Sequence, residues 1–304
     1  MLDTPVLFLV FNRPETTQQV FNVIRQAQPK HLFVAADGPR PGKEDERALC
    51  DKTREIATAV DWDCELHTLF RNENLGCGLA VSGAITWFFE NVEEGIILED
   101  DTLPDLSFFS FCTVLLEKYR HNDTVKLISG NNFQQGKWRG DGSYYFSAYS
   151  HIWGWASWRR VWQQYDYKLA QQDEASVNKA MDFYFTNPKI KKHWLNIFQQ
   201  IKAGTFNTWD LQLLFCIWDK KGISALPNIN LITNIGFGTG ATHTADINDK
   251  LSNIPYGSLK LVNHPSKHSL DKDADTYTFS KIYRSKEKLL SRIARKIIRK
   301  RISK

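Results

Sequence analysis

Short apolar runs alternate with helix-like segments over the first hundred residues of this 304-residue chain. The apolar runs have the length of buried strands and span residues 5–11, 32–36, 65–70 and 95–98. The segments between them carry apolar residues at helical spacing and span residues 15–27, 44–59 and 79–91. Strands that alternate with helices in this way form βαβ units around a parallel sheet. We therefore expect an α/β fold with a Rossmann-like sheet flanked by helices.

Polar residues follow each of the predicted strands. They are Asn12-Arg13, Asp37-Gly38, Arg71-Asn72 and Glu99-Asp100-Asp101. Ligands of open α/β sheets bind beyond the carboxyl ends of the strands. The segment 37–39 alone is more typical of an ordinary turn than of a site, but four polar strand ends on one edge favour a binding site there.

The βαβ rhythm fades after residue 124. Two more strand-like runs, 125–129 and 144–148, precede an aromatic block, several helical segments and a loop-rich region from 228 to about 281. With 42% hydrophobic residues, the chain has enough material for one large core. The expected organisation is a nucleotide-binding half at 1–124, a helical acceptor-binding half of the same domain at 125–280, and a basic amphipathic helix at 281–304.

The basic charge is concentrated at the end of the chain. Residues 284–304 carry a net charge of +9, whereas the whole chain carries +5, so the remainder is at −4. Basic residues lie on one side of this helical pattern and apolar residues on the other. Such helices bind anionic membrane surfaces, each basic residue contributing about 1 kcal/mol. The alternative is a helix that docks on the protein body or on a partner, and a nucleic-acid-binding surface is not indicated.

The cysteines and the apolar runs indicate the cellular location of the protein. The five cysteines are odd in number and scattered, which predicts buried free thiols without disulfides or a zinc site. No apolar run reaches the roughly 18 residues that span a bilayer, and residues 1–5 lack the pattern of a signal peptide. We expect a cytoplasmic protein held peripherally at the inner face of the cytoplasmic membrane.

The buried run that starts at Gly95 ends in three carboxylates, Glu99, Asp100 and Asp101. Like charges this close repel and raise each other's pKa. Mg²⁺ and Mn²⁺ bind carboxylate oxygens together with substrate phosphates, and such an ion relieves the repulsion. The alternative is a solvated strand end or a helix cap.

These motifs resemble the GT-A fold glycosyltransferases, in detail the N-acetylglucosaminyltransferase I type and related bacterial nucleotide-diphospho-sugar transferases. The resemblance covers about residues 5–101. It implies that Asp101 binds Mn²⁺ or Mg²⁺ directly and that Asp37 binds the nucleoside. It implies donor or nucleotide contacts for Phe11, Asn12, Arg13, Arg71, Asn74, Gly76, Glu99 and Asp100.

The aromatic block at 151–158 resembles the Gly-Trp segment that lines the sugar and acceptor pocket in this family. The resemblance implies sugar or acceptor contacts for Trp153, Gly154, Trp155 and Trp209. Aromatic faces pack on sugar rings, but tryptophans this dense are also typical of a core.

Two later residues complete the resemblance. Asp210, which follows Trp209, matches the Asp that acts as general base on the acceptor hydroxyl. Its alternative role is the N-cap of the following helix. His243 follows a glycine-rich loop and matches a late metal or diphosphate ligand, with a surface histidine as the alternative.

The function that the resemblance implies is a metal-dependent inverting glycosyltransferase of bacterial surface-polysaccharide synthesis. Its donor is a nucleotide-sugar, which family analogy identifies as a UDP-sugar, and its acceptor is a glycan or a lipid-linked glycan. A sugar nucleotidyltransferase is one alternative, although residues 11–14 lack the glycines that follow the first strand in such enzymes. A non-catalytic carbohydrate- or membrane-binding protein is the other, and it leaves the three carboxylates unexplained.

Overall fold

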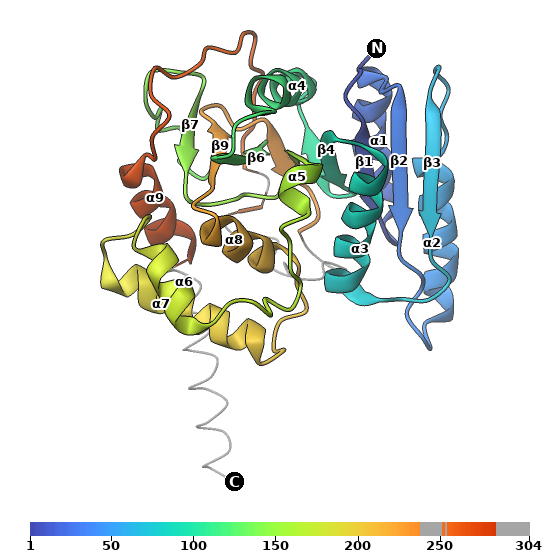
Figure 1. The fold of residues 1–304 in the computed structure, drawn as a ribbon. Helices are drawn as coiled ribbons and strands as arrows, with labels where there is room; N and C mark the ends of the chain where they lie inside the picture. Colours follow the sequence, from blue (N-terminus) through green and yellow to red (C-terminus); the bar gives the residue numbers. More distant parts are fainter. Residues whose placement is uncertain (238–250, 253, 284–304) are drawn as a thin grey trace.

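The chain folds around one large mixed sheet with helices on both faces (Figure 1). The computed structural model describes residues 1–237, 251–252 and 254–283. The strand order is β3-β2-β1-β4-β8-β6-β9-β7, which confirms the expected α/β fold class. The strands are β1 (Val6–Val10), β2 (His31–Ala36), β3 (Glu65–Phe70), β4 (Glu94–Glu99), β6 (Val125–Ser129), β7 (Tyr144–Ser147), β8 (Trp155–Trp158) and β9 (Ile223–Pro227).

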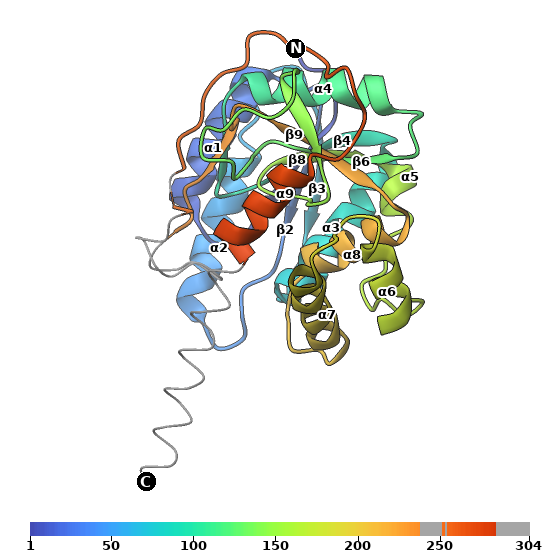
Figure 2. The ribbon, with the colours of Figure 1, turned by 90° about the vertical axis from the view of Figure 1, so that its left-hand side faces the viewer.

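The helices cover the sheet in two layers. Figure 2 shows α1 and α2 on one side of the sheet and α3 and α8 on the other. The helices are α1 (Pro14–Ala27), α2 (Glu44–Ala57), α3 (Gly76–Asn91), α4 (Ser107–Tyr119), α5 (Arg159–Trp162), α6 (Glu174–Met181), α7 (Pro188–Lys202), α8 (Asp210–Asp219) and α9 (Lys272–Thr278), with a π-helical turn at Phe279–Tyr283.

The first half of the sheet is parallel, as the alternation of strands and helices predicts. β1 pairs in parallel with both β2 and β4, and β2 pairs with β3. Because strand side chains alternate between faces, Phe8 packs in the core beneath α1, whereas Leu7 and Leu9 pack in the core beneath α3. β1 is therefore buried on both faces, which explains its continuous apolar sequence.

The second half departs from this pattern at β8. This strand pairs antiparallel with both β4 and β6, and β7 pairs antiparallel with β9. The sequence predicts β6 and β7 but not β8, because the segment of β8 is part of the aromatic block that resembles a sugar-binding segment. The loop-rich region also contains a strand, β10 (Ile232–Asn234), which pairs with β5 (Thr102–Pro104) directly after the three carboxylates.

The cysteines of the described structure are free thiols. Cys50, Cys112 and Cys216 are buried and Cys64 and Cys77 are half-buried, so the prediction of free thiols is confirmed. Burial raises the pKa of the Cys112 thiol well above its ordinary value.

No helix among the described residues is both long and apolar enough to cross a membrane. The predicted basic helix is outside the described residues from residue 284 onward. The division of the domain at residue 124 stays a prediction.

Candidate functional site

The ends of β1 and β4 meet at one edge of the sheet, as expected. The backbone N–H of Phe11 donates a hydrogen bond to Asp100 Oδ2 at 3.1 Å. The Arg13 guanidinium donates to Asp101 Oδ2 at 2.7 Å and lies 3.9 Å from Asp100 Oδ1. The structure therefore joins two of the four predicted polar strand ends through one arginine and two carboxylates.

Burial perturbs the charges of this cluster. It raises the pKa of Glu99 well above its ordinary value, and repulsion from Asp101 and Asp100 adds to the effect. Burial, with repulsion from Asp101, also raises the pKa of Asp100 to about 7, although the positive charge of Arg13 opposes the shift. Burial raises the pKa of Asp101 as well. Ionising these carboxylates together beside a single arginine is therefore costly, and a further cation would relieve that cost.

The segment after β10 covers Asp101. The backbone N–H of Ile235 donates to the Asp101 carbonyl at 2.8 Å. A Cβ at position 236 would lie 2.2 Å from Asp101 Oδ2, so only glycine allows this approach. The N–H of Gly236 donates to the Asn234 side chain at 2.9 Å. Sequence reasoning did not assign Asn234 and Gly236 to the site, and the glycines of this segment were the available signal.

The geometry restricts how a metal ion would bind here. In the described structure, the ligand atoms of Glu99, Asp100 and Asp101 do not form a group of three within 4.8 Å of one another. A site made wholly of these carboxylates therefore does not fit. A site of one carboxylate completed by substrate phosphates does fit, because Mg²⁺ is usually bound in this way. Asp101 is the residue placed to provide that carboxylate.

Asp210 is the first residue of α8 and is half-buried. Its negative charge raises the pKa of both Glu99 and Cys77, which places it within electrostatic range of the carboxylates. The Thr208 hydroxyl donates a hydrogen bond to Asp210 Oδ1. Trp209 occupies the N-cap position of α8, so Asp210 does not have the alternative N-cap role.

Asp37 has a clear structural role. Its carboxylate accepts hydrogen bonds from the N–H groups of Leu75 and Gly76, each at 3.1 Å, and from Gly38 at 3.0 Å. It thus caps the start of α3 from the neighbouring strand. This explains why α3 begins at Gly76 and not at the predicted residue 79. The Gly76 N–H was expected to face the nucleotide, but here it is bonded to Asp37.

The remaining nucleotide-side residues lie around the ends of β1, β2 and β3. Asn74 donates to the Gly38 carbonyl at 2.8 Å and Asn12 donates to Glu46 Oε1 at 2.9 Å. The positive charge of Arg71 lowers the pKa of Asp37 against the larger effect of burial.

A pocket of about 390 Å³ opens next to these strand ends. Its lining includes Asn72 and Asn74 together with Arg40, Lys43 and Arg47, which sequence reasoning did not assign to the site. The signal for them was the run of basic residues in the loop after Asp37. The pocket therefore places amide and basic side chains beside one of the predicted nucleotide-binding turns.

The aromatic block is mostly core, which corrects the expected sugar contacts. Trp155 and Trp209 are 1% and 2% exposed and stack on each other with ring centroids 5.7 Å apart. Their side chains pack in the core between the sheet and helices α3 and α8, so neither ring face is open to a sugar. Trp153 is half-buried, and its ring lies 6.0 Å from that of Phe237, next to the segment that covers Asp101.

Gly154 is needed for packing. It adopts a φ of +58°, and a Cβ there would lie 1.9 Å from the Ile232 side chain. Its backbone carbonyl accepts a hydrogen bond from Gly130 at 2.7 Å. This explains the glycine without a sugar.

Two histidines lie in or near the predicted site segments. His243 is outside the described residues, so its predicted metal or diphosphate contact stays a prediction. His151 is buried, and burial lowers its pKa to about 3, so it is a neutral side chain of the core.

Comparisons with known proteins find only distant structural matches. No protein-family model and no curated protein matches the chain. Among solved structures, HddC from Yersinia pseudotuberculosis is 11% identical with a TM-score of 0.32, over 53% of this chain and 80% of that one. A UDP-glucose pyrophosphorylase complexed with UDP-glucose is 11% identical, with a TM-score of 0.32 over 54% and 79%. An apo UDP-glucose pyrophosphorylase is 9% identical, with a TM-score of 0.37 over 74% and 91%. These TM-scores are too low for those proteins' activities to inform the function of this chain, and the resemblance to GT-A glycosyltransferases stays a prediction.

Proposed function

We propose that the chain is a glycosyltransferase that moves a sugar from a nucleotide-diphosphate donor to a glycan or lipid-linked acceptor. The observation that carries the proposal is the meeting of Arg13, Asp100 and Asp101 at the ends of β1 and β4, with Asp210 in electrostatic range. A cation-binding cluster beside a further carboxylate is what transfer from a diphosphate donor requires.

In the proposed reaction, Asp101 would hold Mn²⁺ or Mg²⁺, which would supply positive charge to neutralise the diphosphate leaving group. Arg13 is placed to bind the same phosphates, because its guanidinium lies beside Asp101. The pocket lined by Arg40 and Asn74 takes the nucleotide part of the donor. Trp153 is the aromatic residue that remains available for the sugar or the acceptor.

Asp210 is the proposed general base. It takes the proton of the acceptor hydroxyl while that oxygen bonds to the anomeric carbon and the nucleoside diphosphate departs. This single displacement inverts the anomeric configuration. Glu99 is less suited to the role, because burial and repulsion from Asp101 and Asp100 raise its pKa well above the ordinary value.

A sugar nucleotidyltransferase is the second candidate. Such an enzyme would use the same α/β sheet and the same metal-binding carboxylates. Residues 11–14, at the connection from β1 to α1, weigh against it. They include no glycine that would let phosphates approach the backbone. A glycosyltransferase releases nucleoside diphosphate, whereas a sugar nucleotidyltransferase releases pyrophosphate.

The first test is a thermal-shift screen of nucleotide-sugars with and without Mn²⁺. A donor that binds the folded state raises the melting temperature. We expect one or more donors to do so only with metal present, and transfer assays with that donor to release nucleoside diphosphate. Release of pyrophosphate from a nucleoside triphosphate and a sugar phosphate would favour the second candidate, and stabilisation by none of the donors would contradict both.

The second test is the variant Asp210→Asn. General base catalysis contributes about 10²–10⁴-fold to rate, so we expect transfer to fall by at least about 100-fold while the donor-induced thermal shift is kept. Asp219→Asn, at the exposed end of the same helix, is the matched control and should transfer at the wild-type rate. Wild-type turnover in Asp210→Asn would remove Asp210 from the mechanism.

Association with a membrane is a separate part of the proposal. It rests on the basic amphipathic pattern of residues 284–304 in the sequence. Sedimentation with vesicles that contain anionic lipids, compared with neutral vesicles, tests it.

A further inference from the structure

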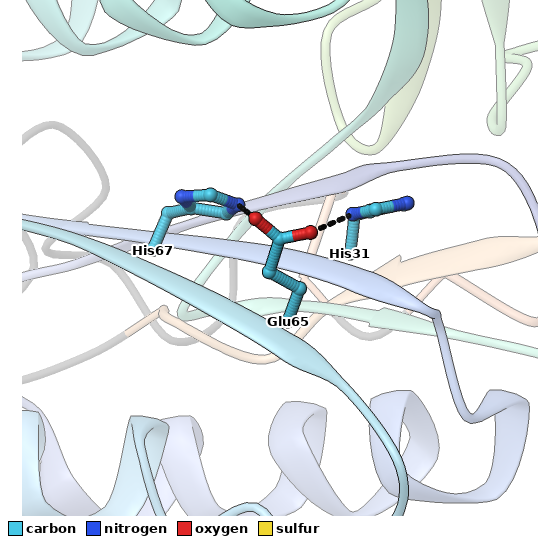
Figure 3. A group of neighbouring side chains, drawn as sticks. All are labelled: His31, Glu65 and His67. Atoms are coloured by element: carbon cyan, nitrogen blue, oxygen red, sulfur yellow. Dashed lines mark ion pairs between the residues drawn. The ribbon is translucent and has the colours of Figure 1, made fainter.

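Three side chains converge on the outer strands of the sheet, far from the carboxylate cluster. The His31 ring nitrogen Nδ1 lies 3.2 Å from Glu65 Oε2, and His67 Nε2 lies 3.1 Å from Glu65 Oε1. Figure 3 shows the Glu65 carboxylate between the two imidazole rings. The potential ligand atoms of the three residues all lie within 4.8 Å of one another.

Strand register holds the three residues together. His31 is paired directly with Glu65 across β2 and β3, and Phe33 is paired with His67. Because side chains two residues apart on a strand share a face, Glu65 and His67 both project to the same side. The His67 ring stacks on Phe33 with centroids 4.3 Å apart, which fixes its plane. The arrangement therefore depends on the pairing of the strands and not on a flexible loop.

The donor set suits a transition-metal ion. Two imidazole nitrogens and one carboxylate form a common protein site for Zn²⁺, with water as the fourth ligand. Neighbouring ligand atoms of a tetrahedral Zn²⁺ ion lie about 3.4 Å apart when the bonds are about 2.1 Å long. The two distances of 3.1 and 3.2 Å are close to this spacing. The His31 side chain is 44% exposed and has room for the small rotation that completes the geometry.

We propose that His31, Glu65 and His67 form a binding site for one divalent transition-metal ion, with Zn²⁺ as the ion that fits best. Alkaline-earth ions fit less well, because imidazole is a poorer ligand for Mg²⁺ and Ca²⁺ than oxygen is. The site is independent of the proposed glycosyltransferase activity. The six-residue strand β2 separates His31 from Asp37 and the nucleotide side by about 20 Å.

The bound ion ties β3 to β2. β3 is at the edge of the sheet and is bonded to β2 alone among the strands of the described structure. All six of its residues, Glu65–Phe70, are paired with a residue of β2, and an ion at the start of both strands would add a further link between them. Binding of the ion to the folded state therefore raises its stability.

The test is isothermal titration of untagged, chelator-treated protein with ZnCl₂. His31→Ala and His67→Ala each remove one ligand, and Glu65→Gln weakens the third while both rings and the stacking on Phe33 stay in place. We expect each alanine variant to weaken Zn²⁺ binding by at least about tenfold, since even groups that only support a metal ligand change affinity by about 10–100-fold. His121→Ala removes an exposed histidine elsewhere and should bind Zn²⁺ as the wild type does.

A second measurement distinguishes the loss of a metal ligand from a change in folding. Co²⁺ replaces Zn²⁺ in such sites, and its visible absorption reports the ligands directly. We expect the wild type and His121→Ala to give the same bands and the His31→Ala and His67→Ala variants to lose them. Zn²⁺ affinity in both alanine variants equal to that of the wild type, or a wild type without saturable Zn²⁺ binding, would overturn the proposal. The nucleotide-sugar screen on His67→Ala separates this outcome from failure of the proposed function, because donor binding does not involve His67.

Discussion

Replacing Asp37 with alanine should lower the free energy of unfolding by about 2–4 kcal/mol. The carboxylate is the acceptor for the first backbone N–H groups of α3, at Leu75 and Gly76. Each loses its partner in the variant, and an unsatisfied donor costs up to about 1–3 kcal/mol where water does not replace the lost acceptor. The N–H of Gly38 is less affected, because it also donates to the Glu73 carbonyl at 3.2 Å.

The asparagine variant separates the cap from the nucleotide contact. Leu75 N lies 3.1 Å from both Asp37 oxygens and Gly76 N lies 3.1 Å from Oδ2, so one amide oxygen in that position still accepts both bonds. We expect Asp37→Asn to lose less than about 1 kcal/mol. If Asp37 also binds the nucleoside, as the family resemblance implies, Asp37→Asn will lose much of the donor-induced thermal shift while it remains folded.

Urea unfolding followed by circular dichroism measures the effect. Asp3→Ala, which removes an aspartate that is exposed at the surface, is the control and should leave the transition midpoint unchanged. The cap argument fails if Asp37→Ala unfolds within about 0.5 kcal/mol of the wild type with an unchanged m-value.

Two further predictions concern buried positions. Gly154→Ala should lower the free energy of unfolding by about 1–3 kcal/mol, because its φ is +58° and the new methyl group would collide with Ile232. The same urea titration measures it, and wild-type stability would show that the backbone adjusts freely. For Asp275, burial raises the pKa to about 7. The folded state therefore favours the protonated acid, and the stabilising contribution is complete below about pH 4 and lost as the pH rises through about 7, a change of about 4 kcal/mol. Asp275→Asn should flatten this part of the stability profile, and an identical slope in both proteins would refute the assignment.

The first half of the fold could be predicted because its signal is local. A strand such as β1 is buried on both faces and has a continuous apolar sequence, and α1 begins at a proline and buries one face. The second half of the fold was harder to predict, because the aromatic sequence of β8, with Trp155 and Trp158, is typical of both a core strand and a sugar-binding segment. The sequence gives no local signal that separates these two interpretations.

The site was predictable in part. The pairing of Arg13 with Asp101 follows from two strands that end at the same edge, which the βαβ pattern implies. The bond between Asp37 and Gly76 connects residues far apart in the chain, and it depends on how β2 and α3 are oriented. The convergence of His31 with Glu65 depends on the register of two strands, and a shift by one residue would turn the side chains to opposite faces.

The tryptophan stack beneath Asp210 affects how the proposed base would work. Trp209 precedes Asp210, stacks on Trp155 of the sheet, and receives a hydrogen bond from the Tyr165 hydroxyl to its carbonyl at 3.2 Å. The backbone that carries the base is thus fixed on the protein core before any substrate arrives, and little reorganisation energy is required of it during the reaction. Substitutions in this stack should therefore slow the chemical step through misalignment of the base, even though the rings themselves never contact the sugar.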